Sequence, residues 1–239
     1  GADLDGASLH VLDDTGKTVD SWVSVKGKPH VLKGLKTGKT YTLWEETAPY
    51  GYLLADQITF TVADTEEIQK VTMTGTVPTA QLLINKKGEF LDKVTFSEHS
   101  KNIVEHFFEY ISGSLQTFEV YAAETIKAAD GVSPDYYGAD ELIATIKTNR
   151  SGIASLEQLP LGRYYVKEAA TEYGHVLDEK RRYVDLTYRG QDTPVVFYDE
   201  NWQNSRQRIQ IEILKREKGS DYNLSGAVFG LFTKKDILP

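Results

Sequence analysis

The amino-acid sequence predicts a mainly β protein built from tandem antiparallel sandwiches. Short segments in which apolar and polar residues alternate recur along the 239-residue chain, and turns rich in Gly, Asn and Asp separate them. Two groups of residues also repeat at long range, which indicates several copies of one module. Residues 97–111 are the exception, because their apolar positions follow the period of a helix.

Four segments show the strand pattern in chain order. Residues 40–47 (TYTLWEET) and 58–62 (ITFTV) place every second side chain on the same face. Residues 164–168 (YYVKE) and 209–215 (IQIEILK) alternate in the same way. Period two at this density is typical of antiparallel sheets with one buried face, so it predicts a sandwich.

The segment Ser97–Ile111 predicts an amphipathic helix, inserted into the second module over about residues 88–115. Ser97 or Ser100 would be its N-cap. Its apolar positions recur at helical spacing, at Ile103, Val104, Phe107, Phe108 and Ile111. A second, short helical turn is predicted over Ala122–Ala129. Elements added to a scaffold often carry binding, so the insertion is a candidate binding surface.

The long-range repeats indicate the domain boundaries. L-K-T-G at 35–38, with Tyr41, Glu45 and Gly51 after it, recurs about 124 residues later as L-P-L-G at 159–162, with Tyr164, Glu168 and Gly174. L-D-G-A at 4–7 recurs as L-S-G-A at 224–227, and T-F-E-V-Y at 117–121 is a looser copy. We therefore expect a first domain at 1–78 that lacks its first strand, a second at 79–205 with the insertion, and the truncated start of a third at 206–239.

Composition excludes several classes of function. The net charge is −8, from 35 acidic and 27 basic residues, which disfavours binding to nucleic acids and to anionic membrane surfaces. No apolar run approaches the ~20 residues of a membrane-spanning helix. The chain has no cysteine, so disulfides and thiolate metal sites are excluded. His99 and His106 lie near the predicted helix without the H-E-x-x-H pattern, and we expect no metal and no cofactor.

The repeated residues resemble the CnaB-type modules (SpaA-like, prealbumin-like fold) of Gram-positive surface adhesins and pilins. Residues 41–52, YTLWEETAPYGY, nearly match the family's E-box pattern Y-x-L-x-E-x-x-A-P-x-G-Y. The second domain keeps YYVKE and Gly174 but not the Ala-Pro. The resemblance covers most of the chain apart from about 88–115. It implies Greek-key, prealbumin-like sandwiches and an autocatalytic isopeptide bond between a Lys and an Asn or Asp within one domain.

In the second domain, the resemblance implies Lys86 as nucleophile, Asp199 as electrophile and Glu168 as the acid/base. Burial lowers the pKa of a lysine and raises that of a carboxyl group, which favours attack by a neutral amine. Alternation places Asp199 on the same face as Val195 and Phe197. A slip of one residue in register would bring in the other candidates, namely Lys87, Asn201 and Asn204. A bond closing the loop from 86 to 199 would contribute about 4–5 kcal/mol.

The other two modules depart from this pattern. In the first, Glu45 occupies the E-box position, but the strand that would carry its lysine is absent and Gly75 stands where the last strand has Asn or Asp. We expect no isopeptide bond there. In the third, Lys215 matches the nucleophile, and its partners would lie beyond Pro239.

The resemblance implies a structural role, as a stalk, adhesin or pilin module of an extracellular, wall-anchored protein whose partners are neighbouring domains of the same protein. Its chemistry would be a single self-crosslinking step without turnover, so we do not expect an enzyme. Two alternatives stay open: a module that binds host matrix protein or carbohydrate through the insertion or exposed aromatic residues, and an accessory β domain of a secreted hydrolase.

Overall fold

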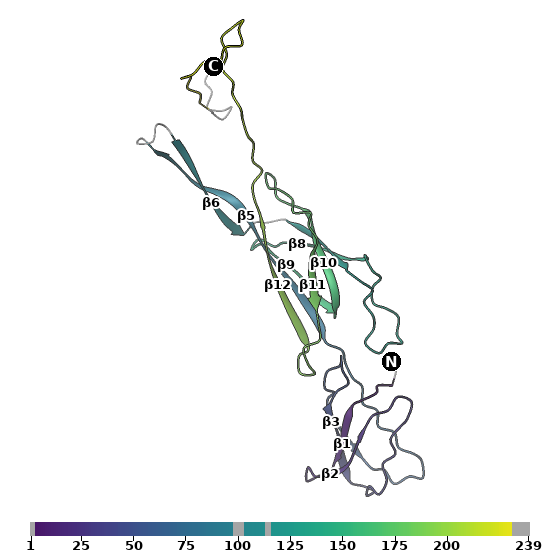
Figure 1. The fold of residues 1–239 in the computed structure, drawn as a ribbon. Helices are drawn as coiled ribbons and strands as arrows, with labels where there is room; N and C mark the ends of the chain where they lie inside the picture. Colours follow the sequence, from purple (N-terminus) through teal and green to yellow (C-terminus); the bar gives the residue numbers. More distant parts are fainter. Residues whose placement is uncertain (1–2, 98–102, 113–115, 231–239) are drawn as a thin grey trace. The chain divides into compact units, whose positions relative to one another are not determined.

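The computed structural model describes residues 3–97, 103–112 and 116–230, and within these ranges every regular element is a β-strand (Figure 1). The chain divides into two compact units, Gly1–Arg206 and Gln207–Pro239. All named strands lie in the first unit. Among the described residues, no helix is long and apolar enough to cross a membrane. The predicted mainly β class is therefore confirmed.

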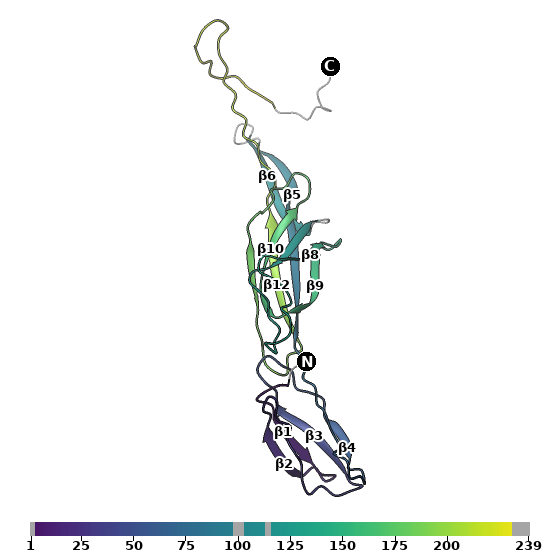
Figure 2. The ribbon, with the colours of Figure 1, turned by 90° about the vertical axis from the view of Figure 1, so that its right-hand side faces the viewer.

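The N-terminal part of the first unit is one antiparallel sheet with the strand order β2-β1-β3-β4 (Figure 2). Its strands are β1 (Ser8–Leu12), β2 (Thr18–Val23), β3 (Thr40–Thr47) and β4 (Ile58–Thr61). The alternation in β3 buries Tyr41, Leu43 and Glu45, which the period-two pattern of its sequence requires. Val11, Tyr41 and Leu43 form a small core, and partly buried apolar side chains from loops and neighbouring strands pack on it.

The rest of the first unit holds two further sheets. One has the order β11-β10-β7-β8 and is antiparallel, and it consists of β7 (Thr117–Ala122), β8 (Leu142–Lys147), β10 (Gly162–Ala170) and β11 (Arg182–Leu186). The other has the order β12-β5-β6, with β9 also paired to β5, and it consists of β5 (Thr79–Ser97), β6 (Ile103–Ser112), β9 (Ile153–Pro160) and β12 (Val195–Asn204).

A single apolar core lies between these two sheets. Leu82 and Ile84 of β5 pack with side chains of β7, β10 and β12, including Phe118, Tyr164 and Trp202. β5 runs parallel to β12 and antiparallel to β9, so it is the central strand of its sheet at this end. The first strand of the second domain, β5, therefore lies directly beside its last strand, β12.

The prediction of a helix over Ser97–Ile111 is wrong. The described residues of this segment form a long antiparallel hairpin, in which β5 pairs with β6 from Lys87↔Ser112 to Ser97↔Ile103 (Figure 1). Ser100 lies outside the described residues. The apolar spacing was misleading because large apolar side chains lie on both faces of this strand. Each is partly exposed, at 41% for Phe107 and 44% for Phe108, so the sequence shows no alternation of apolar and polar residues. Aromatic and β-branched composition is the better guide in such a segment.

The predicted helical turn over Ala122–Ala129 is also wrong. These residues leave β7 through bends, and Ile126 forms an isolated bridge with Tyr137. The side chain of Ile126 is buried in the core and packs against the backbone of Gly162.

Candidate crosslinking site

A buried lysine and a buried glutamate from opposite sheets meet in the core of the second domain. Lys86 of β5 and Glu168 of β10 have fully covered side chains, and Lys86 Nζ lies 2.8 Å from Glu168 Oε1. The strand pattern produces this position, because Ala80, Leu82, Ile84 and Lys86 all point inward at two-residue spacing. A lysine and a glutamate are almost never buried in this way unless they are paired.

Asn204, at the end of β12, completes the group. Its amide Nδ2 donates hydrogen bonds to both carboxylate oxygens of Glu168, at 2.9 and 2.7 Å, and approaches Thr171 Oγ1 at 2.7 Å. Its carbonyl Oδ1 is buried and has no hydrogen-bond partner among the described residues. Lys86 and Asn204 therefore both contact the one carboxyl group, and the amide carbonyl oxygen of Asn204 is left without a partner among the described residues.

Asp199 does not join this group, and the expected orientation of its strand is wrong. The inward side chains of β12 are Val196, Trp202 and Asn204, whereas Phe197 is 63% exposed. The register pairs Asp199 with Leu83 and Trp202 with Lys86, so Asp199 lies on the outer face, where its carboxylate contacts the Asn85 amide. The run VVFYDE carries apolar residues at both parities, so only its continuation through Trp202 and Asn204 reveals the buried face.

The other two alternative residues are also exposed. Lys87 pairs with Gln203 on the outer face, and Asn201 offers its backbone carbonyl to Arg182. Of Lys87, Asn201 and Asn204, only Asn204 is hydrogen-bonded to the carboxyl group of Glu168.

The surroundings of Lys86 favour its neutral form. Burial lowers the pKa of Lys86, and the hydrogen bond and charge of Glu168 offset part of this effect. Nζ lies 5.9 Å from the ring centroid of Phe118 and 5.8 Å from that of Trp202. Among the described residues it makes the ion pair with Glu168 but no hydrogen bond of good geometry. An ammonium ion with three donors is poorly satisfied there, which favours transfer of a proton to the carboxylate.

The backbone fixes the carboxyl group of Glu168. The N–H of Asp178 donates to Oε2 at 2.9 Å, from the loop that follows β10. Asp178 and Glu200 in turn pair with Arg182, whose guanidinium lies 3.9 Å from the Trp202 ring. Both oxygens of Glu168 are thus held, one by the lysine and the asparagine, the other by the asparagine and the backbone.

Comparison with known proteins identifies the fold family. A family model described as SpaA, prealbumin-like fold domain, matches residues 1–77 and 116–201, which together are well over half of the chain. The chain belongs to this family. The resemblance to SpaA-like, CnaB-type modules and the prealbumin-like fold are therefore confirmed. The matched residues omit all of β5 and β6, so the gap includes the long hairpin together with the part of β5 that carries Lys86.

Solved structures with distant likeness to this SpaA-like chain include two bacterial pilins and a third bacterial protein. The Bacillus anthracis TIE protein is 19% identical, with a TM-score of 0.45 over 84% of this chain and 30% of that protein. The minor pilin GBS52 of Streptococcus agalactiae is 12% identical, with a TM-score of 0.36 over 90% and 89% of the two chains. The shaft pilin SpaA of Lactobacillus rhamnosus GG is 12% identical, with a TM-score of 0.33 over 87% and 90%. No curated protein matches the chain.

The first SpaA-like domain holds a partial version of the same site. Glu45 is buried and accepts a hydrogen bond from the Ala55 N–H at 2.7 Å, ten residues on, as Glu168 does from Asp178. Leu53 N–H bonds to the Thr76 carbonyl at 2.8 Å, and Val176 N–H to the Ser205 carbonyl at 2.9 Å, so Gly75 holds the place of Asn204. Lys86 is the only buried lysine among the described residues. Glu45 therefore has neither the amine nor the amide.

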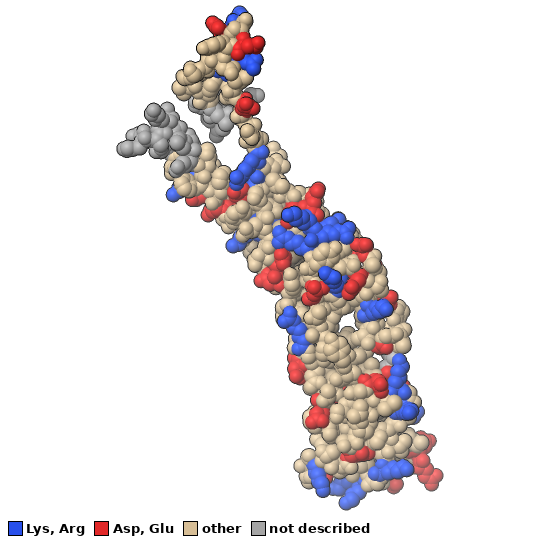
Figure 3. Space-filling model, in the orientation of Figure 1, with Lys and Arg blue, Asp and Glu red and all other residues tan. Residues whose placement is uncertain are grey.

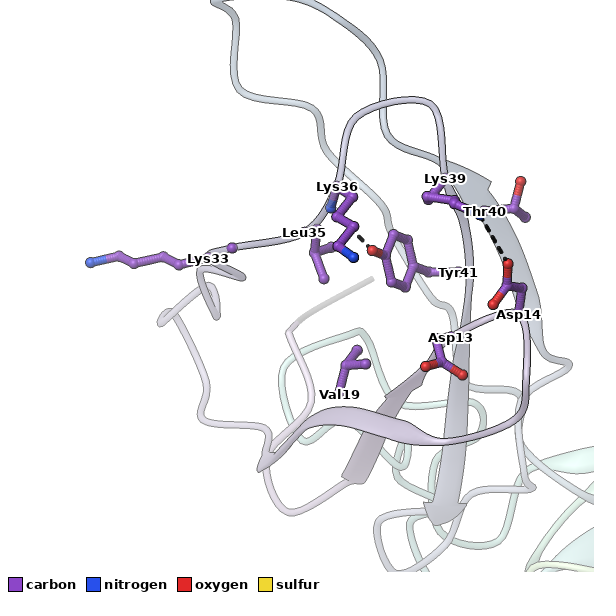
Figure 4. A pocket seen from close by; sticks show the side chains of 10 residues that line it. Asp13, Asp14, Val19, Lys33, Leu35, Lys36, Lys39, Thr40 and Tyr41 are labelled. Atoms are coloured by element: carbon purple, nitrogen blue, oxygen red, sulfur yellow. Dashed lines mark hydrogen bonds and ion pairs between the residues drawn. The ribbon is translucent and has the colours of Figure 1, made fainter.

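The remaining candidates contribute no further site. Lys215 lies in the second unit and is exposed. A hollow in the first domain is lined by exposed residues such as Lys33, Lys39 and Asp14, and Figure 4 shows Lys33 pointing out of it. Its one ion pair, Lys39 to Asp14 at 3.4 Å, is at the surface. The described residues hold no group of three or more His, Cys, Asp or Glu residues that fits a metal ion.

Proposed function

We propose that this chain is a structural module of a Gram-positive cell-surface protein, such as a stalk or pilin subunit, whose second domain is locked by an isopeptide bond between Lys86 and Asn204. The observation that carries the proposal is the buried contact of Lys86 and Asn204 with the same carboxyl group, that of Glu168. Family membership supports the structural role. The extracellular location follows from the same proposal.

The reaction needs only the groups already in contact. The Lys86 ammonium gives a proton to Glu168, which leaves a neutral amine and a neutral carboxylic acid. Nζ attacks Cγ of Asn204 while Nδ2 stays hydrogen-bonded to the carboxyl group of Glu168, which is placed to hand its proton to the departing nitrogen. The Cγ–Nδ2 bond then breaks, the nitrogen takes a proton from the Lys86 amine through Glu168, and ammonia leaves. The product is an uncharged amide, so the cost of burying an ion pair disappears.

The reacting groups are already held together by the fold, so the reaction would need no separate enzyme. Lys86 and Asn204 lie on neighbouring parallel strands, and a shared carboxyl group orients both. Such intramolecular placement reaches effective concentrations of roughly 10⁵–10⁸ M. The chain would therefore carry out one self-modification and no further catalysis.

The position of the bond would suit a domain that carries mechanical tension. β5 opens the second domain and β12 closes it, so a bond between them closes a loop of roughly 120 residues. Tension between the two ends of the domain would then pass from strand to strand through the bond. The sheets inside the loop would stay folded, and this replaces the disulfides that a chain without cysteine cannot form.

Intact mass tests the proposal directly. The purified chain should be lighter by one NH₃, about 17 Da, and a branched peptide should join the segments that contain Lys86 and Asn204. Asn204→Ala, Lys86→Ala and Glu168→Ala should each restore the full mass. Asp199→Ala is the matched control and should keep the loss. A full mass for the unsubstituted chain, or a loss of water that depends on Asp199, would overturn the assignment.

A second candidate function is binding through the β5–β6 hairpin. The hairpin exposes apolar side chains at Leu91, Val94, Phe107, Phe108, Tyr110 and Ile111, a concentration that is unusual for a solvated surface. Elsewhere on the face in Figure 3, Lys, Arg, Asp and Glu are interspersed. Binding to a matrix protein or glycan array that is lost when Phe107 and Phe108 are both replaced by Ser would support this function. Unchanged binding, or none, would exclude the hairpin as the surface.

A further inference from the structure

An arginine occupies a core-facing position beside the crosslinking site. The inward side chains of β11 are Arg182, Val184 and Leu186, and the two apolar ones are almost completely buried. Arg182 lies opposite Val166 of β10, which is two residues from Glu168, and its side chain is 31% exposed. Charged side chains are seldom placed toward a core unless they are paired. The partners of Arg182 therefore indicate its role.

The guanidinium of Arg182 joins two segments that hold the reacting groups. Nη2 lies 3.0 Å from Asp178 Oδ2, and the backbone N–H of Asp178 donates to Glu168 Oε2 at 2.9 Å. Nη1 lies 2.8 Å from Glu200 Oε1 and donates to the carbonyl oxygen of Asn201 at 3.1 Å. Glu200 and Asn201 belong to β12, the strand that carries the proposed electrophile. One side chain thus ties the loop that fixes the acid to the strand that presents the amide.

Arg182 also covers the aromatic wall of the site. Its guanidinium carbon lies 3.9 Å from the centroid of the Trp202 ring, and that centroid lies 5.8 Å from Lys86 Nζ. Trp202 is fully buried, whereas part of the Arg182 side chain meets solvent. β11 and β12 each stand at the end of the strand order of their sheet, so the arginine spans the seam between the two sheets. Its side chain therefore helps to keep water from the reacting amine.

The charge of Arg182 acts on Lys86 in the direction that the reaction needs. The charged groups around Nζ are Glu168 on β10, Asp178 in the loop after β10 and Arg182 on β11, while β7 and β12 contribute aromatic rings. Burial lowers the pKa of Lys86 most, and the hydrogen bond and charge of Glu168 raise it. The charge of Arg182 lowers this pKa again, and the charge of Asp178 raises it. Because Arg182 pairs with Asp178 as well as with Glu200, it also offsets a carboxylate that favours the ammonium form.

We propose that Arg182 is a positioning residue of the crosslinking reaction, which holds the carboxyl group of Glu168 and the end of β12 in their reactive geometry. The inference rests on the proposed isopeptide bond. Arg182 acts through Asp178, Glu200 and Trp202 rather than on the reacting atoms themselves. A guanidinium suits this role because its planar fork binds carboxylates on two segments at once, whereas a lysine offers a single point charge. Displacement of a reacting group by about 1 Å can cost roughly 10²-fold in rate.

The rate of crosslinking in Arg182 variants is the first test. Chain isolated unfolded and uncrosslinked from inclusion bodies is refolded, and the loss of about 17 Da is followed by intact mass. Arg182→Met and Arg182→Lys should each slow this loss at least about tenfold, because neither side chain has the planar fork that spans Asp178 and Glu200. Arg163→Met is the matched control and should react at the unsubstituted rate. Arg163 also pairs with a carboxylate, that of Asp185 at 3.2 Å, and stacks on a tyrosine, but it lies on the outward face of β10.

The pH profile separates positioning from a general loss of stability. The rate should decline at strongly alkaline pH, where the Lys86–Glu168 pair loses its shared proton. Arg182→Met removes a positive charge near Lys86 and leaves Asp178 without that partner, so the pKa of Lys86 rises and the decline moves to higher pH. Arg182→Lys keeps the charge, so its rate should be lower but its decline should stay in place. A slower Arg182→Met variant whose decline also stays in place would show only lost stability and would overturn the proposal.

A folding control accompanies every variant. Each is also prepared with Asn204→Ala, and its denaturation midpoint shows whether the uncrosslinked domain is folded in the reaction buffer. Asp178→Asn is a milder change that keeps the backbone donor to Glu168 but weakens the tie to Arg182, and it should slow the loss of mass as well. Folded Arg182 and Asp178 variants that react at the unsubstituted rate would overturn the positioning role and leave the bond intact. An unsubstituted chain that keeps its full mass would overturn both.

Discussion

Replacing Asn204 by Ala tests the structural role of the crosslink more sharply than any other single change. The variant loses the electrophile but keeps the Lys86–Glu168 ion pair. In the unfolded wild-type chain, the bond would restrain a loop of roughly 120 residues, which is worth about 5 kcal/mol at 25 °C by the chain-entropy model. For a domain of this size, a loss of that magnitude lowers the melting temperature by about 15–20 °C.

Glu168→Ala should destabilise the domain further, although both variants lack the bond. It leaves the Lys86 amine buried without its partner, which typically costs about 3–5 kcal/mol more. The expected order of stability is therefore wild type, then Asn204→Ala, then Glu168→Ala. Two variants with the same missing bond but different stabilities separate the effect of the crosslink from that of the ion pair.

The assay is guanidinium unfolding followed by the fluorescence of Trp202, which is fully buried beside Phe118. Trp22 and Trp44 are replaced by Phe in every sample, so the signal reports the second domain alone. The intact mass of each sample is measured before unfolding. An Asn204→Ala variant within about 1 kcal/mol of the wild type would refute the loop-entropy argument. A Glu168→Ala variant that still lacks 17 Da, about one NH₃, would refute the acid/base role.

Three further predictions concern rate, packing and the hairpin. First, crosslinking should slow at strongly alkaline pH, because the buried Lys86–Glu168 pair needs its one shared proton, and burial lowers the pKa of Lys86. Chain isolated unfolded and uncrosslinked from inclusion bodies is refolded at several pH values while its mass is followed, and a rate that keeps rising into strongly alkaline pH contradicts this. Second, Gly162→Ala should destabilise the second domain by about 1–3 kcal/mol, because the added Cβ would lie 2.5 Å from Ile126 Cδ1, whereas Gly138→Ala meets only ordinary contact and should change the denaturation midpoint little. Third, Phe107→Ser should leave the free energy of unfolding within about 0.5 kcal/mol of the parent, since its side chain is 41% exposed, and a larger loss would show that the hairpin packs on the domain.

The sequence was sufficient for the fold because two independent signals agreed. Period-two alternation in β3 and β10 predicted half-buried strands, and the E-box stretch at 41–52 identified the family to which the chain belongs. The positions of Lys86 and Glu168 could also be predicted, because each follows a run in which every second residue is apolar and buried. Where the apolar pattern has one parity, the buried face follows from it.

The errors arose where that condition fails. In β12, apolar residues stand at both parities, and alternation from Val195 and Phe197 points to Asp199 rather than to Asn204. The outer face of β12 is simply less polar than usual, with Phe197 exposed. In the described part of the hairpin, Leu91, Val94 and Phe107 are each more than two fifths exposed, so its apolar residues carry no sheet period. Only the pairing partners, which are remote in sequence, distinguish these cases.

The two E-box glutamates show that the motif alone does not supply the partners that a crosslink needs. Glu45 and Glu168 occupy equivalent buried positions and accept the same hydrogen bond from a backbone N–H ten residues later. Their difference lies in two other strands, one that brings an amine and one that brings an amide. Because the first domain has Gly75 at the amide position, even a correctly placed lysine would give it an ion pair and no covalent bond. The same glutamate site could therefore support an ion pair alone or a covalent lock, and the residue at the position of Gly75 or Asn204 would decide between them.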